Sequence, residues 1–287
     1  MKKTAQYRTE ILSSENVLQA LQRESMLPEL VLLDAAAKGA VWVSLQRGKG
    51  KTRPRRLRSL NTNVSEGSGV ILNYDPAVLS KAPQPMHCLS DHVNYGIWFK
   101  PAGMLCQGSK WSDHTVATQV AAGSTGKHCY LVHRLDKAAC GLLLIAYTQN
   151  ALRSLAVMFE KRLVSKTYQA TVTGNMCAEL PMTVDNPIDG KAASTTVLKV
   201  EFDTEHNRSV LTLSIDSGRK HQIRRHLAEL GYPIVGDRLY GHQKDNESPA
   251  SDLQLVACQL GFKCPFTTDA VSVTIDANSA LSGSSSF

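Results

Sequence analysis

The sequence lacks several features that would place it in a familiar class of proteins. Its seven cysteines are odd in number and include no C-x-x-C pair, which argues against a disulfide framework or a zinc ribbon. No apolar run reaches the roughly 18 residues that a membrane span needs, and no apolar stretch of a signal peptide follows the first lysines. We find no internal repeat. These absences favour a cytoplasmic globular protein with reduced thiols and no membrane contact.

Acidic residues are missing from one short stretch, and that stretch carries the whole net charge. Residues 47–58 hold seven bases and no acid, whereas bases and acids balance in the rest of the chain, so that the formal charge is +7. Such a run is either a solvated loop or an arm that binds a polyanion, and we expect it to contact nucleic acid. Its bases are Arg47, Lys49, Lys51, Arg53, Arg55, Arg56 and Arg58.

The length of 287 residues allows two domains with a sizeable core. Residues 1–75 predict helix, helix, strand, basic loop and strand, and the glycines and Pro54 of the loop argue against regular structure there. This layout resembles the alpha-L RNA-binding domain, with a small α+β cap that carries a basic loop as the alternative. Prolines indicate an extended linker over 76–91, and small polar residues indicate a flexible tail over 277–287.

The region between linker and tail, residues 92–276, consists mostly of short apolar strands. Helices are predicted near 112–122, 150–161 and 220–230. Many strands with scattered helices predict an α+β domain around a mixed, mostly antiparallel sheet.

Four motifs follow one another in this region: HRLD at 133–136, KTYQA at 166–170, SGRKHQIRRHLAELG at 217–231 and YPIVGDRLYG at 232–241. In this order they resemble the RluA-type pseudouridine synthases of RNA, and FKPAGM at 99–104 resembles the lysine–proline–glycine motif of that family. The resemblance implies the pseudouridine synthase fold and an isomerase. Because the isomerisation involves no redox change and no group transfer, it needs no cofactor and no metal.

The resemblance implies three catalytic residues. Asp136 is the nucleophile or base, and its carboxylate could attack the sugar, attack the base or take a sugar proton. An ionised carboxylate in a dry pocket needs a partner, which the resemblance identifies as a bidentate Arg224. Tyr168 is implied to stack on the uracil, and its hydroxyl could relay the carbon-5 proton. The alternative for Tyr168 is a tyrosine packed within the sheet.

Further residues are expected to contact the RNA, whose target base must first leave its stack. Arg134 matches the family residue that fills the space of the flipped nucleotide, and a phosphate contact is the alternative. His133 is grouped with it, although we expect His133 to orient the motif rather than transfer protons. Arg219 and Lys220 lie at a helix start whose dipole attracts phosphate. Arg225 is either an RNA contact or part of a solvated face.

The chain departs from the family pattern at four positions. Ala139 and Cys140 replace the usual Thr-Ser, and small residues packed beneath a strand explain this better than a nucleophilic pair of Cys140 with His133. Val256 and Cys264 stand where many members have histidine. None of these changes reaches the proposed chemistry.

The sequence therefore predicts a monomeric RNA pseudouridine synthase that acts on specific uridines of structured RNA, with ribosomal RNA favoured and transfer RNA next. The alternative is a non-catalytic RNA-binding or ribosome-assembly factor on the same scaffold, which would have no physical need to keep Asp136, Tyr168 and Arg224 together. Another nucleic-acid enzyme is a third possibility. The basic run should add affinity for the RNA backbone without choosing the base.

Overall fold

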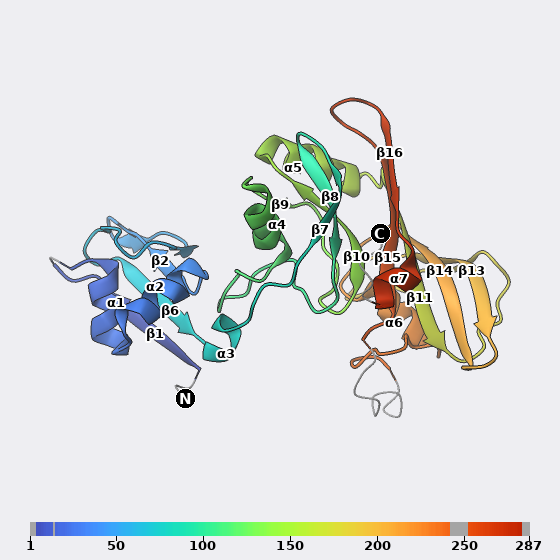
Figure 1. Ribbon diagram of the computed structural model, residues 1–287, viewed down its shortest axis with the longest axis horizontal. Coiled ribbons are helices and arrows are strands. Elements are labelled where there is room, and N and C mark those ends of the chain that lie inside the picture. The colour runs from blue at the N-terminus through green and yellow to red at the C-terminus, as the bar shows by residue number, and fades with distance from the viewer. Residues whose placement is uncertain (1–3, 14, 242–251, 283–287) are drawn as a thin grey trace. The chain divides into compact units, whose positions relative to one another are not determined.

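The computed structural model describes residues 4–13, 15–241 and 252–282, and Figure 1 shows their course. The chain divides into two compact units. The N-terminal unit comprises Met1–Gln84 together with Gln107–Val120, and the sheet unit comprises Pro85–Cys106 together with Ala121–Phe287. No helix in the described part of the chain is long and apolar enough to cross a membrane.

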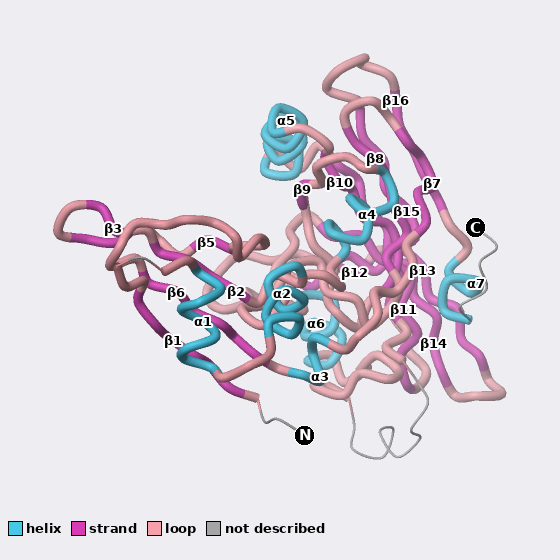
Figure 2. Tube along the Cα trace, turned by 60° about the vertical axis from the view of Figure 1, so that its left-hand side comes forward, coloured by secondary structure: helices cyan, strands magenta, loops and turns pink. Residues whose placement is uncertain are grey.

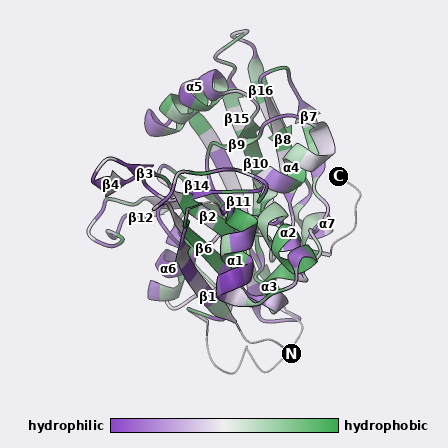
Figure 3. Cartoon of the chain, turned by 90° about the vertical axis from the view of Figure 1, so that its left-hand side faces the viewer, coloured by the Kyte–Doolittle hydropathy of each residue, from purple (hydrophilic) through white to green (hydrophobic). Residues whose placement is uncertain are grey.

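The N-terminal unit is built on a four-stranded sheet with the strand order β1-β6-β2-β5, in which every neighbouring pair is antiparallel. Helices α1 and α2 share one apolar core with these strands, and α1 lies beside β1 and β6 in Figure 2. Apolar and polar residues occupy different sides of α1, as the two colours of this helix in Figure 3 show. The elements are β1 (Ala5–Glu10), α1 (Val17–Ser25), α2 (Glu29–Ala37), β2 (Val41–Ser44), β5 (Arg55–Arg56), β6 (Gly69–Tyr74) and α3 (Pro76–Leu79).

Two features of this unit differ from the sequence prediction. Strand β1 is not predicted, because the segment AQYRTE contains few apolar residues; it becomes a strand by pairing all six residues with β6. The basic segment is partly regular, contrary to expectation. It holds the hairpin of β3 (Gln46–Arg47) and β4 (Gly50–Lys51), which is mainly purple in Figure 3, and β5, which pairs with β2. Backbone pairing in these short strands therefore outweighs the glycines and Pro54.

The sheet unit contains a ten-stranded sheet with the main order β12-β13-β14-β11-β15-β10-β8-β7, while β16 pairs with β15 and β9 pairs with β10. In the described chain only β10 and β15 run parallel, so the predicted mixed, mostly antiparallel α+β fold is confirmed. The strands are β7 (His87–Asp91), β8 (Tyr95–Lys100), β9 (Tyr130–Leu131), β10 (Cys140–Ala146), β11 (Val164–Thr173), β12 (Met182–Val184), β13 (Thr195–Asp203), β14 (Arg208–Ile215), β15 (Leu255–Lys263) and β16 (Ala270–Thr274).

Four helices complete the chain: α4 (Ala117–Thr125), α5 (Gln149–Glu160), α6 (Gln222–Glu229) and α7 (Ala277–Ser282). Helices α5 and α7 bury apolar residues against β8, β10 and β15 in one core. Helix α6 contacts β13 and brings the HQIR motif to the sheet. The three helices predicted from the sequence correspond to α4, α5 and α6.

Three segments differ from the expected domain plan. The segment 76–91, predicted as an extended linker, contains α3 and the sheet strand β7. The predicted tail begins with α7, whose Ala277 and Ala280 are buried in the core, while residues 283–287 lie outside the described residues. Residues 107–120 join the N-terminal unit, which the sequence does not indicate.

Candidate active site

Asp136 lies in the loop between β9, which ends at Leu131, and β10, which begins at Cys140. The backbone on both sides of Asp136 is held by the segment 99–106. Before it, the Leu135 N–H donates to Cys106 Sγ, and the Cys106 thiol can donate to the Leu135 carbonyl, both over 3.4 Å. After it, the Lys137 carbonyl accepts from the N–H of Gly103 over 2.8 Å. The FKPAGM motif and Cys106 therefore fix the position of the carboxylate.

Lys100 strengthens this arrangement from inside the protein. Its buried ammonium donates to the carbonyls of Pro101 and Met104 over 2.8 and 3.0 Å, and lies 3.5 Å from the carbonyl of Lys137. Burial lowers the pKa of Lys100 to about 8. Lys100 thus connects the turn that follows it in the FKPAGM motif to the loop that contains Asp136.

Gly141 allows the Asp136 loop to approach Tyr168. It lies opposite Ala257 in the parallel pair of β10 and β15, with a φ of +119°, and a Cβ there would overlap the backbone of Ala257. On the other edge of β15, Tyr168 of β11 lies opposite the same Ala257. Only glycine fits this contact. Strand β10, which follows the Asp136 loop, and strand β11, which contains Tyr168, can therefore pair with β15 from its two sides.

Asp136, Tyr168 and Arg224 line one pocket of about 190 Å³. The three catalytic candidates, from three distant motifs, are therefore brought together. The apolar part of the pocket consists of side chains such as Ile215, Ile223 and Leu255. The exposed residues Arg134, Arg219 and Lys220 also line it, and make its surroundings cationic. The pocket thus combines one carboxylate with an aromatic ring, an apolar surface and several cations.

Arg224 is held mainly by Asp237, which differs from the expected bidentate pair with Asp136. Its Nε and Nη2 each donate to Asp237 over 2.7 Å, while its Nη1 lies 3.5 Å from Oδ2 of Asp136. Asp237 also accepts hydrogen bonds from the backbone N–H groups of Leu239 and Tyr240. The GD-x-x-YG turn therefore fixes the guanidinium, which keeps one nitrogen for Asp136.

The charges of this pair are stable. Burial is the largest single influence and opposes ionisation of both partners. Their mutual hydrogen bonds and charges, the backbone hydrogen bonds to Asp237 and the contact of Arg224 with Asp136 together outweigh it, so that the pKa of Asp237 is lowered and the pKa of Arg224 is raised. The side chain of Asp237 is fully buried, and that of Arg224 is 5% exposed. Asp136 therefore faces a permanent positive charge.

Tyr168 and His221 complete the surroundings of the carboxylate. Burial, and secondly the charge of Asp136, raises the pKa of Tyr168, so that its phenol stays neutral. His221 Nε2 lies 4.0 Å from Asp136 Oδ1, and its Nδ1 is 3.0 Å from the hydroxyl of Tyr240. Burial lowers the pKa of His221, and the charge of Asp136 opposes this effect. The sequence does not indicate a role for Asp237, Tyr240 or His221, although all three lie within the motifs at 217–231 and 232–241.

His133 lies away from the pocket lining. Its Nε2 accepts a hydrogen bond from the Leu144 N–H over 3.0 Å, and its ring stacks on Phe159 with the centroids 4.6 Å apart. Burial, with a smaller contribution from the charge of Lys166, lowers the pKa of His133 to about 3, so the ring is neutral. These contacts are those of a side chain that orients the HRLD motif.

Cys140 is buried beneath the site and stays protonated, because burial raises its pKa to about 11. Its Sγ is 3.9 Å from the carbonyl of Leu255, and the ring nitrogen of His133 is bonded elsewhere. Ala139 is buried beside it. Ala139 and Cys140, two of the four departures from the family pattern, thus pack inside the protein.

The remaining cations differ in how far they are engaged. Arg219 donates from Nε to the Ala192 carbonyl over 3.0 Å, and Arg225 forms an exposed ion pair with Asp189 over 2.9 Å. Within the basic segment, Lys51 pairs with Glu10, while Arg56 and Arg58 both bind Asp113. The other four bases are exposed and form no ion pair with any residue that the structure describes: Arg47, Lys49, Arg53 and Arg55.

Comparisons with known proteins agree with this geometry. Residues 94–229 match the family described as RNA pseudouridylate synthase. The tRNA pseudouridine synthase C of Yersinia pestis is 32% identical over 206 residues, covering 61% of this chain and 80% of the relative. The dual-specificity RNA pseudouridine synthase RluA of Yersinia pestis is 33% identical over 175 residues, covering 56% and 84%. The solved structure of human RNA Pseudouridylate Synthase Domain Containing 1 has a TM-score of 0.57 at 22% identity and covers 68% of this chain and 85% of its own.

The family match and the named relatives therefore place the chain among the RNA isomerases of the pseudouridine synthase class. Within that class, the chain belongs to the RluA-type family of RNA pseudouridine synthases. The match begins at residue 94, so the resemblance of the N-terminal unit to the alpha-L domain stays a prediction.

Proposed function

We propose that this chain converts specific uridines of structured RNA to pseudouridine, with Asp136 as the nucleophile or base. The observation that supports this most directly is the position of Asp136, in one pocket with Tyr168 and 3.5 Å from an Arg224 that Asp237 holds. The reaction breaks the bond from N1 to the anomeric carbon and forms one from carbon 5. A proton moves from carbon 5 to N1, so the atoms balance without a cofactor, a metal or a second substrate.

The side chains divide the work as follows. The flipped uracil stacks on the ring of Tyr168 and lies against the apolar part of the pocket. Arg224 lies 3.5 Å from the carboxylate of Asp136, which attacks the sugar, attacks the base or takes a sugar proton. The Tyr168 hydroxyl, neutral at rest, accepts the carbon-5 proton only as it passes its own proton on. No step in this scheme requires water in the pocket.

RNA is held outside the pocket by cations. Arg134 fills the space of the flipped nucleotide or binds a phosphate, and Arg219 and Lys220 bind phosphates at the start of α6. His133 supports Arg134 by orienting the loop. The substrate is a transfer RNA or a ribosomal RNA, and the name of the relative at 32% identity supports testing transfer RNA first. We propose that the enzyme works as a monomer in the cytoplasm.

Pseudouridine mapping tests this function. The purified chain is incubated with total RNA from a strain that lacks its gene, and pseudouridines are then located by chemical mapping. We expect new pseudouridine at one or a few uridines, matching those lost in the deletion strain. If no uridine of either RNA class changed while ribosome assembly failed in the deletion strain, the chain would be the non-catalytic assembly factor instead.

The basic segment allows a test of how RNA is held. Changing Arg47, Lys49, Arg53 and Arg55 together to glutamine should weaken RNA binding and reduce the slope of log Kd against log salt by about 3, because each lost phosphate contact contributes roughly 0.7–0.9. Turnover at saturating RNA should persist. Arg23→Gln is the control, since Arg23 is another base of the same unit that pairs with Glu15 over 2.9 Å, and its loss should leave the salt slope nearly unchanged. Loss of turnover at saturating RNA would instead place these bases in the active site.

A further inference from the structure

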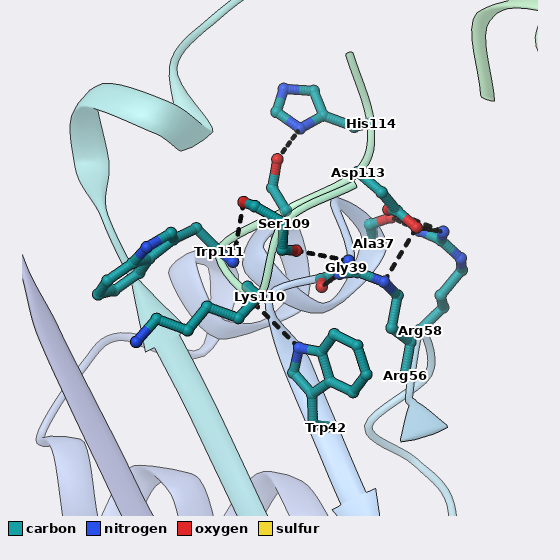
Figure 4. A network of polar contacts seen from close by, with 11 residues as sticks. Ala37, Gly39, Trp42, Arg56, Arg58, Ser109, Lys110, Trp111, Asp113 and His114 are labelled. Carbon is teal, nitrogen blue, oxygen red and sulfur yellow. Dashed lines mark hydrogen bonds and ion pairs between the residues drawn. The ribbon is translucent and has the colours of Figure 1, made fainter. Parts of the chain in front are cut away.

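The N-terminal unit includes a segment that is distant from it in sequence, Gln107–Val120, and a buried carboxylate anchors it. Asp113 is 8% exposed. Its oxygens accept from Nη2 of Arg58 over 2.9 and 2.8 Å and lie 3.1 Å from Nε of Arg56, and its N–H donates to the Lys38 carbonyl over 3.1 Å. Figure 4 shows the contacts of Asp113 with Arg56 and Arg58. Arg56 and Arg58 of the basic segment therefore hold Gln107–Val120 in place.

Close backbone approach supports the same anchor. Gly39 follows α2 with a φ of +80°, and a Cβ there would overlap the carboxylate of Asp113. Its carbonyl accepts a hydrogen bond from Arg56. The end of α2 is therefore shaped to receive Asp113, which makes this a specific docking rather than a loop lying on the surface.

The anchored segment presents a tight turn, residues 109–112. The N–H of Ser109 donates to the Ser112 carbonyl over 3.1 Å, and the N–H of Trp111 lies 3.3 Å from the Ser109 hydroxyl. The carbonyl of Lys110 accepts from Nε1 of Trp42 over 3.0 Å. The backbone of the turn, the Ser109 hydroxyl and the Trp42 indole thus hold the turn, and the side chains of Lys110 and Trp111 take no part in these bonds.

The two tryptophans of this region have different surroundings. Trp42 is engaged on its ring and on its N–H, because the guanidinium of Arg56 lies 4.4 Å from the ring centroid and Lys110 takes its hydrogen bond. Trp111 is only partly buried and points away from the Asp113 network in Figure 4. The ammonium of Lys110 lies 4.9 Å from its ring centroid, and no described residue accepts a hydrogen bond from its indole N–H.

We propose that Trp111 and Lys110 form a second RNA-binding site, where an unpaired base stacks on the indole and Lys110 holds a neighbouring phosphate. This inference rests on the proposed function, because it assumes an RNA substrate. An accessible aromatic ring beside a cation is the combination with which proteins bind single-stranded RNA. A turn fixed before binding loses little entropy when a base stacks on it. The site therefore selects RNA with unpaired nucleotides, whereas the four exposed bases of the same unit bind any RNA backbone.

Affinity measurements on the full chain test the site. Trp111→Ala should raise the Kd for the substrate RNA, and for a single-stranded oligonucleotide, about tenfold, within the ~1–3 kcal/mol that stacking contributes per base. The salt slope should not change, because no charge is removed. Lys110→Ala should lower the slope by about 0.7–0.9. Trp111→Tyr should restore most of the affinity, and a blunt RNA duplex should bind wild type and Trp111→Ala equally.

A matched control is Leu30→Ala, which removes another exposed apolar side chain from the same unit and should leave the Kd unchanged. Equal Kd values for wild type and Trp111→Ala, or an equal loss for Leu30→Ala, would overturn the stacking site. A loss that Trp111→Tyr failed to restore would also overturn it. Pseudouridine formation by the wild type separates the two proposals: if it occurs while the Kd values stay equal, only the stacking site fails, and if it does not occur, the proposed function fails.

Discussion

Asp136→Asn is expected to reduce pseudouridine formation by at least ~10³-fold while leaving RNA affinity nearly unchanged. The amide has the shape of the carboxylate but can act neither as a nucleophile nor as a base. The variant loses the charge that faces Arg224 at 3.5 Å, yet Asp237 still holds the guanidinium with two bonds of 2.7 Å. The pocket should therefore keep its shape. Single-turnover release of tritium from RNA labelled at carbon 5 of uracil measures the effect.

The matched control for this experiment is Asp216→Asn, an exposed acid on the same unit that does not line the pocket, which should retain full activity. Kd and the thermal unfolding midpoint are measured on all three proteins. Activity that survived in Asp136→Asn would refute the assignment of Asp136. If Asp136→Asn lost RNA affinity and lowered the thermal unfolding midpoint along with its activity, Asp136 would have a structural role instead.

Asp237→Asn is expected to lower the free energy of unfolding by about 3 kcal/mol, because removing one partner of a buried ion pair leaves the other charge uncompensated. Arg224 is 5% exposed, and its remaining carboxylate contact is the one at 3.5 Å. The lowered pKa of Asp237 means that this stability is present above the ordinary carboxyl pKa of about 3.9 and is lost as the pH falls below it. Urea denaturation at pH 7 and across the acid range measures both effects.

The adjacent arginine offers a control of the same chemistry at the surface. Asp189→Asn removes the partner of Arg225, whose ion pair spans 2.9 Å but is exposed to solvent, so its stability should hardly change. Asp237→Asn should also flatten the acid limb of the stability curve, while Asp189→Asn should not. Equal losses of stability in the two variants would mean that burial does not distinguish the pairs, and that Asp237 does not organise the site.

The sequence motifs contain three side chains that the fold brings together: Asp136 from a loop, Tyr168 from within β11 and Arg224 from α6. These three residues line one pocket, and their catalytic roles stay a prediction. The partner of Arg224 could not be predicted, since two carboxylates lie within its reach and only the fold of the 237–240 turn decides between them. The sequence motif names both acids without giving their distances.

The structure differs most from the sequence prediction in the N-terminal unit. Strand β1 has few apolar residues and depends on pairing with β6, which local patterns do not reveal. Which bases of the basic segment form ion pairs within the protein, and which stay exposed for RNA, also depends on a distant residue, Asp113. Asp113 lies 55 positions from Arg58, and nothing in the sequence around either residue indicates that they meet.

The two hydrogen bonds from Arg224 to Asp237 affect which RNA substrates react fastest. The hydrogen bonds between Asp237 and Arg224 form when the chain folds. The guanidinium of Arg224 therefore lies beside the carboxylate of Asp136 before RNA binds, and no RNA-binding energy is needed to bring the two groups together. What remains to be supplied at each encounter is the extraction of the nucleotide from its helix. Uridines in loops and beside mismatches should thus be modified faster than paired ones, and the ranking of targets will follow the local stability of the RNA.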